Sequence, residues 1–500
     1  MKKILGTTLA AALLFPPGQA SAEILKNLKV SGQLDVQTTA ARNTSDFSTR
    51  GDIDGNGGVL STGNDRIGAA VTRLLVDAKW DLLDDVHSMV TLRKNSRAWG
   101  SAGGVGLGQG GAGSESIGSR NAGNTTNGVI GNLWVDRAAV TIDKLAGHFD
   151  TTLGRQYYGE AGDLIIAYGP KDNYGLFVTA IDAARFEAAN DWVAFSGLAG
   201  KTAGGTLAPA TSDTNVRGFD LLWKGLPLKV HTFMWNQVTQ GAAAGQLGTT
   251  AGKNDNLWVY GVKLRGEAMG GWINADLAAN SGESRSFVSP GAGCTALGCN
   301  NPSANYMGKA LLLDAGYNAE MSGVGALTPW LNFGWGTGRS SNLEGHDEGF
   351  QSIATDYRPG IINRRFTQGA SGLGGGGSAP AIGSAGLTNR VVYGAGLNFT
   401  PAAWEKLTLG TQIWSYNLQR VTQTNVAVAA TAERGAKHLG TEFGLTADWK
   451  HSENVKVGVG GGWYLPGGVV TQAIGTANVA GVSLGNNPAT LAFADFSVKF

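Results

Sequence analysis

Residues Leu491 to Phe500 read L-A-F-A-D-F-S-V-K-F, and this stretch decides the fold class. Counting back from the end, every second residue is apolar: Phe500, Val498, Phe496, Ala494 and Ala492. The residues between them are Lys499, Ser497 and Asp495, with Phe493 as the one apolar exception. A period of two predicts a β-strand with one apolar and one polar face.

A strand that ends on an aromatic residue resembles the C-terminal signal of Gram-negative outer-membrane β-barrels. The resemblance implies that the barrel-insertion machinery recognises Phe500. A soluble β-sandwich could also end on such a strand, so the interpretation depends on the other end of the chain.

The first 22 residues have the pattern of a secretory signal peptide. Lys2 and Lys3 form the charged start, an apolar run follows, and Ala20-Ser21-Ala22 is the small-residue cleavage site. The apolar run is too short for a membrane anchor, which needs about 20 apolar residues. We therefore expect residues 1–22 to be removed and residues 23–500 to form one domain.

The composition favours a barrel over several soluble domains. Among 500 residues there are 78 glycines, 13 prolines and 15% charged residues, yet no long apolar run exists. Transmembrane barrels have this balance because lipid-facing and lumen-facing residues alternate along each strand. The net charge of +1 falls to −1 when Lys2 and Lys3 are removed, and nothing in it indicates a nucleic-acid partner.

The mature chain repeats one unit, which is a strand, a short turn, a second strand and a long glycine-rich loop. The repeat predicts about 18 strands with short periplasmic turns and long extracellular loops. We expect an all-β fold, a transmembrane antiparallel up-and-down β-barrel. The predicted strands lie at about Leu28–Thr38, around Leu74–Leu82, from Val86 to about Trp99, and near Val140, Leu153, Ile181, Phe195, Leu221, Phe233, Val262, Ala275, Leu312, Leu331, Gly394, Leu409, Phe443, Val457 and Phe496.

A barrel of about 18 strands is wide enough for an aqueous channel, so passive passage of hydrophilic solutes is the expected function. The inward-facing positions carry a modest positive excess. The candidate lumen and selectivity residues among them are Arg73, Lys79, Arg93, Arg97, Arg137, Lys263 and Arg265. The arginines of the second, third and fourth strands form either a basic ladder that attracts anions or cross-strand ion pairs with Asp77, Asp81 and Asp143.

The stretch between Asp136 and Phe186 carries a family resemblance. It contains T-L-G-R-Q-Y-Y-G-E from Thr152, then Y-G-P-K-D-N-Y-G, and then I-D-A-A-R-F from Ile181. This stretch resembles the outer-membrane porins of the alginate-export type, in which a glycine-arginine-glutamine strand precedes a loop and a strand with an aspartate-x-x-arginine pattern.

The resemblance implies that Arg155 and Arg185 lie in the lumen or at its constriction, and that anionic oligosaccharides or polysaccharides are transported. Arg155 shares its strand face with Leu153, which is a candidate lipid-facing residue. Either Gly154 marks a bulge that turns Arg155 inward, or the register at this strand differs from the predicted one.

The longest loop, Gly338 to Thr388, either folds into the lumen as a constriction or remains a flexible surface loop. Its first half contains Tyr357-Arg358-Pro359-Gly360 and Arg364-Arg365, which favours an ordered segment there.

Two further features lie in predicted outer loops. Asp52, Asp54 and Asn56 match the first half of a calcium loop, but Gly63 stands where the bidentate glutamate is needed. These residues are candidate ligands for Ca²⁺, and a polar surface turn is the alternative. Cys294 and Cys299 are close together in an exported chain and predict a disulfide.

The sequence as a whole indicates a channel and not an enzyme. We expect a monomer in outer-membrane lipid and lipopolysaccharide that passes anionic or neutral hydrophilic solutes. The alternatives are a general non-selective porin and a plugged barrel that serves a structural or surface-binding role. No other cofactor is expected.

Overall fold

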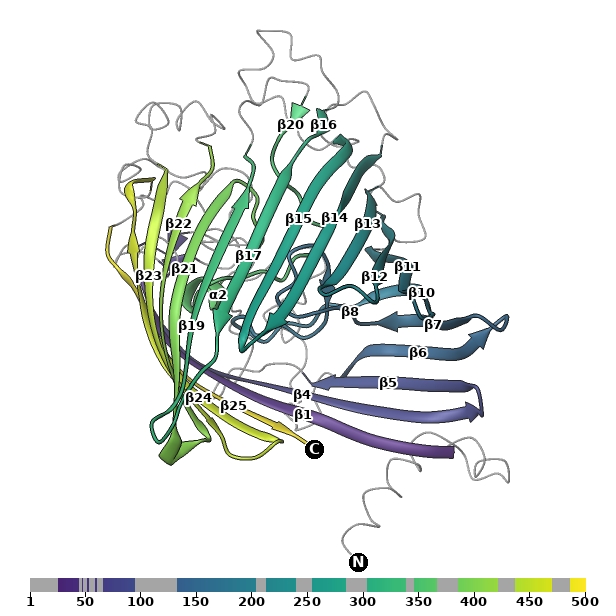
Figure 1. Ribbon diagram of the computed structural model, residues 1–500, viewed down its shortest axis with the longest axis horizontal. Coiled ribbons are helices and arrows are strands. Elements are labelled where there is room, and N and C mark those ends of the chain that lie inside the picture. Colours follow the sequence, from purple (N-terminus) through teal and green to yellow (C-terminus); the bar gives the residue numbers. More distant parts are fainter. Residues whose placement is uncertain are drawn as a thin grey trace, which may run out of the picture.

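The fold is that of a closed antiparallel β-barrel of 18 strands, as a computed structural model shows (Figure 1). Strands pair with their neighbours along the chain, and pairing of the last strand with the first closes the circuit. The predicted fold class and strand number are confirmed. The structure describes residues 26–44, 47, 52–53, 59–60, 66–94, 133–203, 213–239, 254–284, 304–338, 346–366, 385–420, 437–469 and 486–500.

The barrel strands are β1 (Lys26–Arg42), β4 (Arg66–Leu83), β5 (Val86–Lys94), β6 (Leu133–Leu145), β7 (Phe149–Gln156), β10 (Ile181–Ala189), β11 (Val193–Ala203), β12 (Thr214–Trp223), β13 (Lys229–Thr239), β14 (Asp255–Ala268), β15 (Gly271–Ser284), β17 (Lys309–Tyr317), β19 (Gly325–Gly336), β21 (Arg390–Pro401), β22 (Leu407–Leu418), β23 (His438–Lys450), β24 (Val455–Pro466) and β25 (Ala489–Lys499). The connections between them alternate between short turns, such as 84–85 and 451–454, and longer segments.

The smaller elements are β2 (Asp52–Ile53), β3 (Val59–Leu60), β8 (Tyr158–Gly159), β9 (Ala167–Tyr168), β16 (Ala304–Tyr306), β18 (Ala319–Met321), β20 (His346–Asp347), α2 (Ile362–Phe366) and η1 (Ala402–Trp404). In the part of the chain that the structure describes, no helix is long and apolar enough to cross a membrane.

The period-two pattern of the strands separates an outer face from a lumen face. On β23, Phe443 and Leu445 are exposed on the outer face, whereas Glu442 and Gly444 are buried inside the barrel. Several other strands expose large apolar side chains on the outer face, among them Leu331 and Trp463. An apolar outer band around a polar interior is the arrangement that a transmembrane barrel requires.

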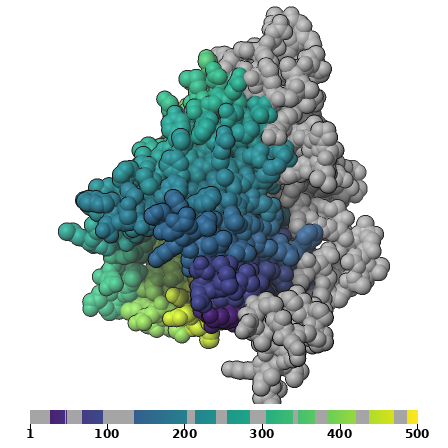
Figure 2. All heavy atoms as spheres, turned by 90° about the vertical axis from the view of Figure 1, so that its right-hand side faces the viewer, coloured from purple at the N-terminus to yellow at the C-terminus, as the bar shows by residue number. Residues whose placement is uncertain are grey.

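The barrel closes where the C-terminal strand meets the N-terminal strand (Figure 2). The backbone N–H of Gly32 donates to the Phe500 carbonyl at 2.7 Å, and the Phe500 N–H donates to the Gly32 carbonyl at 2.9 Å. A Cβ atom on Gly32 would overlap the Phe500 ring, so glycine at this position makes room for the terminal aromatic residue. The strand predicted from the last ten residues therefore forms the seam of the barrel.

Candidate functional site

The lumen is narrowed by a segment between β7 and β10, residues 157–180, which we call the first inner segment. Leu164, Ile165 and Ile166 in this segment are buried against lumen-facing residues of the barrel wall, in one apolar cluster with Trp235. Tyr158 meets Trp235 edge to face, with ring centroids 5.3 Å apart. The strands β11–β14 thus carry apolar residues on their lumen face because this segment covers them.

Residues 346–366 form a second inner segment, which contains α2 and lies against the first. Ala167 N–H donates to the Ala354 carbonyl at 2.7 Å, and Asp356 N–H donates to the Asp163 carbonyl at 2.7 Å. Tyr174 N–H donates to the carbonyl of Arg365 at 2.6 Å. The two segments therefore form a continuous inner layer, and the described part of the long 338–388 loop folds inward.

Glu442 on β23 anchors the second inner segment to the wall. Its carboxylate accepts the backbone N–H groups of Ile361, of Ile362 at 2.8 Å and of Asn363 at 3.2 Å. Tyr416 donates its hydroxyl to the same carboxylate at 3.1 Å. A carboxylate that accepts the unpaired N–H groups at a helix start is a strong charge-assisted contact, so this wall residue fixes where α2 begins.

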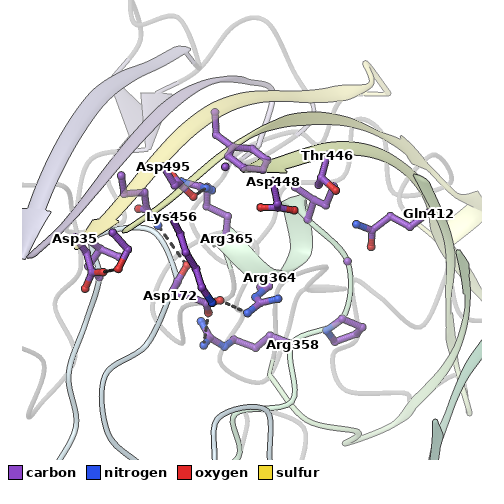
Figure 3. A pocket seen from close by; sticks show the side chains of 18 of the residues that line it. Asp35, Asp172, Arg358, Arg364, Arg365, Gln412, Thr446, Asp448, Lys456 and Asp495 are labelled. Carbon is purple, nitrogen blue, oxygen red and sulfur yellow. Dashed lines mark hydrogen bonds and ion pairs between the residues drawn. The ribbon is translucent and has the colours of Figure 1, made fainter. Parts of the chain in front are cut away.

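A cavity of about 730 Å³ lies between the inner layer and the wall formed by β17 to β25 and β1. The second inner segment presents Arg358, Arg364 and Arg365 to it, as Figure 3 shows. The facing strands present Gln412, Thr446, Asp448 and Lys456. Both sides of the cavity therefore carry polar side chains.

Three cations of the inner layer form ion pairs with two carboxylates of the same layer. Arg358 pairs with Asp356 at 2.7 Å and with Asp172 at 3.0 Å. Lys171 pairs with Asp356 at 3.1 Å, and Arg364 pairs with Asp172. Three cations thus share two carboxylates, and Arg364 keeps more than half of its side chain exposed to the cavity.

Three of these groups, Asp172, Lys171 and Arg364, have shifted pKa values. Burial favours the neutral form of Asp172, but Arg364 and Arg358 outweigh it and hold the pKa of this carboxyl below its usual range. Burial lowers the pKa of Lys171, and Asp356 partly offsets the effect. Asp172 is therefore ionised at neutral pH and bridges the two arginines.

Arg365 connects the inner layer to the seam of the barrel. Its guanidinium pairs with Asp495 at 2.5 Å and lies 4.5 Å above the centre of the Phe493 ring. Phe493, the apolar exception in the terminal strand, therefore faces the lumen and contacts a cation there.

The predicted arginine ladder is present in the lumen, and each described member pairs with a carboxylate. Arg73 pairs with Asp35 at 2.7 Å and also donates to the Lys171 carbonyl at 2.7 Å. The other two pairs are Arg93 with Asp136 at 2.8 Å and Arg137 with Asp77 at 2.7 Å. A register shift in β6 makes Asp136 the extra residue of a bulge, which explains why it and Arg137 both face inward. These pairs match the ion-pairing alternative more closely than an open anion-attracting wall, and Arg97 lies outside the described residues.

Of the other predicted lumen cations, Lys263, Arg265, Arg185 and Lys79 face the interior. Lys263 pairs with Asp163 of the first inner segment, and Arg265 pairs with Asp276 at 2.5 Å. Arg185 pairs with Glu187, and its guanidinium lies 5.4 Å from the centre of the Tyr158 ring. Lys79 is exposed at the lumen face, opposite Lys29 of β1.

Arg155 is placed on the outer face of the barrel, contrary to the lumen position that the resemblance implied. It lies opposite Ala138, whose neighbours Arg137 and Ala139 face the lumen. Gly154 has a φ of +120°, but the strand continues its alternation, and Arg155 pairs with outward-facing Asp182 at 3.2 Å. The glycine therefore does not turn Arg155 inward.

The loop features fall mostly outside the described residues. Asp52 begins the short strand β2, while Asp54, Asn56, Cys294 and Cys299 are not described. Over the described ranges, no group of three or more His, Cys, Asp and Glu residues could hold a metal ion. The Ca²⁺ site and the disulfide remain predictions.

Sequence reasoning identified part of the constriction. It singled out the motifs that contain Arg358, Arg364 and Arg365, but not the first inner segment or the anchor Glu442. The sequence carried one sign of the first inner segment, which is the apolar lumen face of β11–β14. Apolar residues such as Phe233 would face water in an empty barrel, so their presence indicates that another segment covers them.

The closed circuit of 18 strands, the apolar outer face and the polar lumen define an outer-membrane porin fold. Two solved structures with this fold are Acinetobacter baumannii OccAB1 and Pseudomonas aeruginosa OccK9 (OpdG), each with a TM-score of 0.51. OccAB1 is 9% identical, with 96% of this chain and 99% of that chain covered. OccK9 is 10% identical, with 95% of this chain and 100% of that chain covered.

These matches confirm an outer-membrane porin fold and give no support to the alginate-export resemblance. No family model matches the sequence. No curated protein matches it either.

Proposed function

We propose that this chain is an outer-membrane channel through which small hydrophilic solutes diffuse, with a preference for solutes that carry negative charge. The observation that carries the proposal is the polar cavity of about 730 Å³ between the inner layer and the barrel wall. A closed barrel with a plugged lumen would not need a polar cavity beside its inner layer. The fold belongs to channels that perform no catalysis, which supports a transport role over an enzymatic one.

The charge preference rests on Arg358, Arg364 and Lys171, which lie together in the inner layer and pair there with Asp172 and Asp356. Charged groups that line a narrow pore act on passing ions locally, so the arginines of the inner layer bias the solutes that pass beside them. The facing carboxylates of Asp448 and Asp495 limit this bias. We therefore propose weak anion selectivity, and the passage of anionic oligosaccharides is the finer form of the proposal.

The proposal includes how the protein reaches its site. The signal peptide would be residues 1–22, the mature barrel 23–500, and Phe500 the residue that the insertion machinery recognises. The barrel would stand as a monomer in outer-membrane lipid and lipopolysaccharide.

The test is single-channel conductance of the refolded mature protein in a planar bilayer, with a salt gradient and with oligouronates added. We expect an open channel, a reversal potential biased towards anions and a current that oligouronates interrupt. A channel without bias or interruption would indicate a general porin. Absence of conductance would overturn the channel proposal and favour a plugged barrel.

A further inference from the structure

Three tryptophans lie on the lumen face of one side of the wall, on β15, β19 and β22, and each lies opposite a glycine of the strand next to it. Trp272 on β15 faces Gly316 on β17, and Trp330 on β19 faces Gly396 on β21. Trp414 on β22 lies opposite Gly394, also on β21. The aromatic residues and glycines thus alternate across this side of the wall.

The glycines let the indole rings lie against the wall. A Cβ atom on Gly396 would overlap ring atoms of Trp330, and one on Gly394 would overlap the ring of Trp414. Trp330 therefore covers the backbone of β21 with one ring face. Because Trp330 also borders the cavity and is only partly buried, its other side is available to a solute.

Trp414 supports this surface from the side. It is buried, and its ring centroid lies 5.3 Å from that of Trp330 at an interplanar angle of 43°. Its indole N–H donates to Gln412 Oε1 at 2.6 Å. The contact holds Gln412 beside the aromatic pair and keeps its NH₂ group as a donor for a ligand.

The surroundings of Trp330 are rich in neutral hydrogen-bonding groups. Asn332, Asn398, Gln412 and Thr446 line the same cavity. Asn332 accepts the hydroxyl of Tyr357 at 2.8 Å, which orients its amide. An apolar flat surface bordered by amides and a hydroxyl fits a ligand with an apolar ring face and a rim of hydroxyl groups.

We propose that Trp330, supported by Trp414 and Gly396, forms a subsite on which a pyranose sugar ring stacks while its hydroxyl groups contact Asn398 and Gln412. The inference rests on the proposed channel and names the class of solute that it passes. Arg364 across the cavity would add a contact for sugars that carry a carboxylate. A simple aromatic acid would use the ring surface and leave the amides without partners.

Two measurements test the subsite with the mature protein. The first is interruption of single-channel current by maltotriose, by trigalacturonate and by benzoate. The second is saturation-transfer NMR of the same compounds with the protein in detergent micelles, which detects sugar binding without requiring conductance. We expect at least one of the two sugars to interrupt the current, and its ring C–H protons to receive saturation.

The variants separate ring stacking from simple space filling. Trp330→Leu removes the flat surface, and Gly396→Ala keeps Trp330 but displaces its ring. Both should weaken sugar binding about three- to tenfold, and Trp330→Phe should restore part of it. Trp404→Ala, at an exposed turn, and Gly68→Ala, where a Cβ atom meets nothing within 4 Å, are the matched controls and should behave as wild type.

Each outcome decides between the proposals. Sugar binding that depends on Trp330 in a protein without conductance would overturn the channel and retain the subsite. An open channel without sugar binding, or with equal binding in Trp330→Leu and wild type, would overturn the subsite and retain the channel. Binding of benzoate alone would also overturn it.

Discussion

The two sides of the lumen differ in what their inward-facing residues do. On β11–β14, lumen-facing Trp235 and Val259 are fully buried under the first inner segment. On β21–β24, the corresponding positions are Gln412, Thr446 and Asp448 beside the cavity. The first side acts as a protein core, whereas the second side is packed like a core only around Tyr416 and Tyr464 and borders the cavity at these three residues. The proposed solute path is therefore displaced to one side of the barrel, and the two sides should respond differently to mutation.

The largest expected effect is on stability, from Trp235→Ala on the packed side. Removing this buried ring should cost about 3–5 kcal/mol, since the cavity left behind adds to the lost burial. The measurement is the temperature at which the refolded barrel loses its compact form in gel electrophoresis. Thr446→Ala on the channel side is the control and should leave that temperature almost unchanged. Equal losses in both variants would contradict the division into two sides.

A smaller effect is expected from Glu442→Gln, which alters the anchor between the two sides. The substitution replaces a carboxylate that accepts three backbone N–H groups and the Tyr416 hydroxyl. Loss of charge-assisted contacts at a buried site should cost about 1–3 kcal/mol and loosen the second inner segment. Single-channel recordings should show a larger and noisier current. An unchanged current would mean that other contacts hold the segment.

The sequence predicted the barrel because the fold depends on a local pattern. Strand alternation and the lengths of the connections are readable along the chain, and all predicted strand centres fall in observed barrel strands. The site was harder to predict because it depends on contacts between residues far apart in the sequence, such as Arg358 with Asp172. Arg155 shows a further limit of prediction from a motif. The family resemblance implied that Arg155 lies in the lumen, but its position in the strand places it on the outer face.

The third prediction concerns selectivity on the channel side. Arg364→Gln removes the most exposed cation of the inner layer and should lower the ratio of anion to cation permeability by up to about thirtyfold. A unit charge 4 Å from an ion in water favours an anion and disfavours a cation by about 1 kcal/mol each. The reversal potential in a salt gradient measures this ratio. Lys224→Gln, at a short turn between β12 and β13, removes an equal charge far from the cavity and should have no effect. A shift of equal size in both variants would mean that overall charge sets the preference.

The smallest effect is expected from acid pH. Because Arg364 and Arg358 hold the pKa of Asp172 below its ordinary value of about 4, its bridge is intact at neutral pH and is lost only as the pH falls through the lowered pKa. Protonation removes one negative charge from the cluster with Asp356 and Lys171, so anion selectivity should rise below about pH 4. Asp172→Asn should show the higher selectivity already at pH 7 and lose part of the acid response. If Asp172→Asn titrates like wild type, other carboxylates that border the cavity, Asp448 and Asp495, produce the response, and the bridge does not set selectivity.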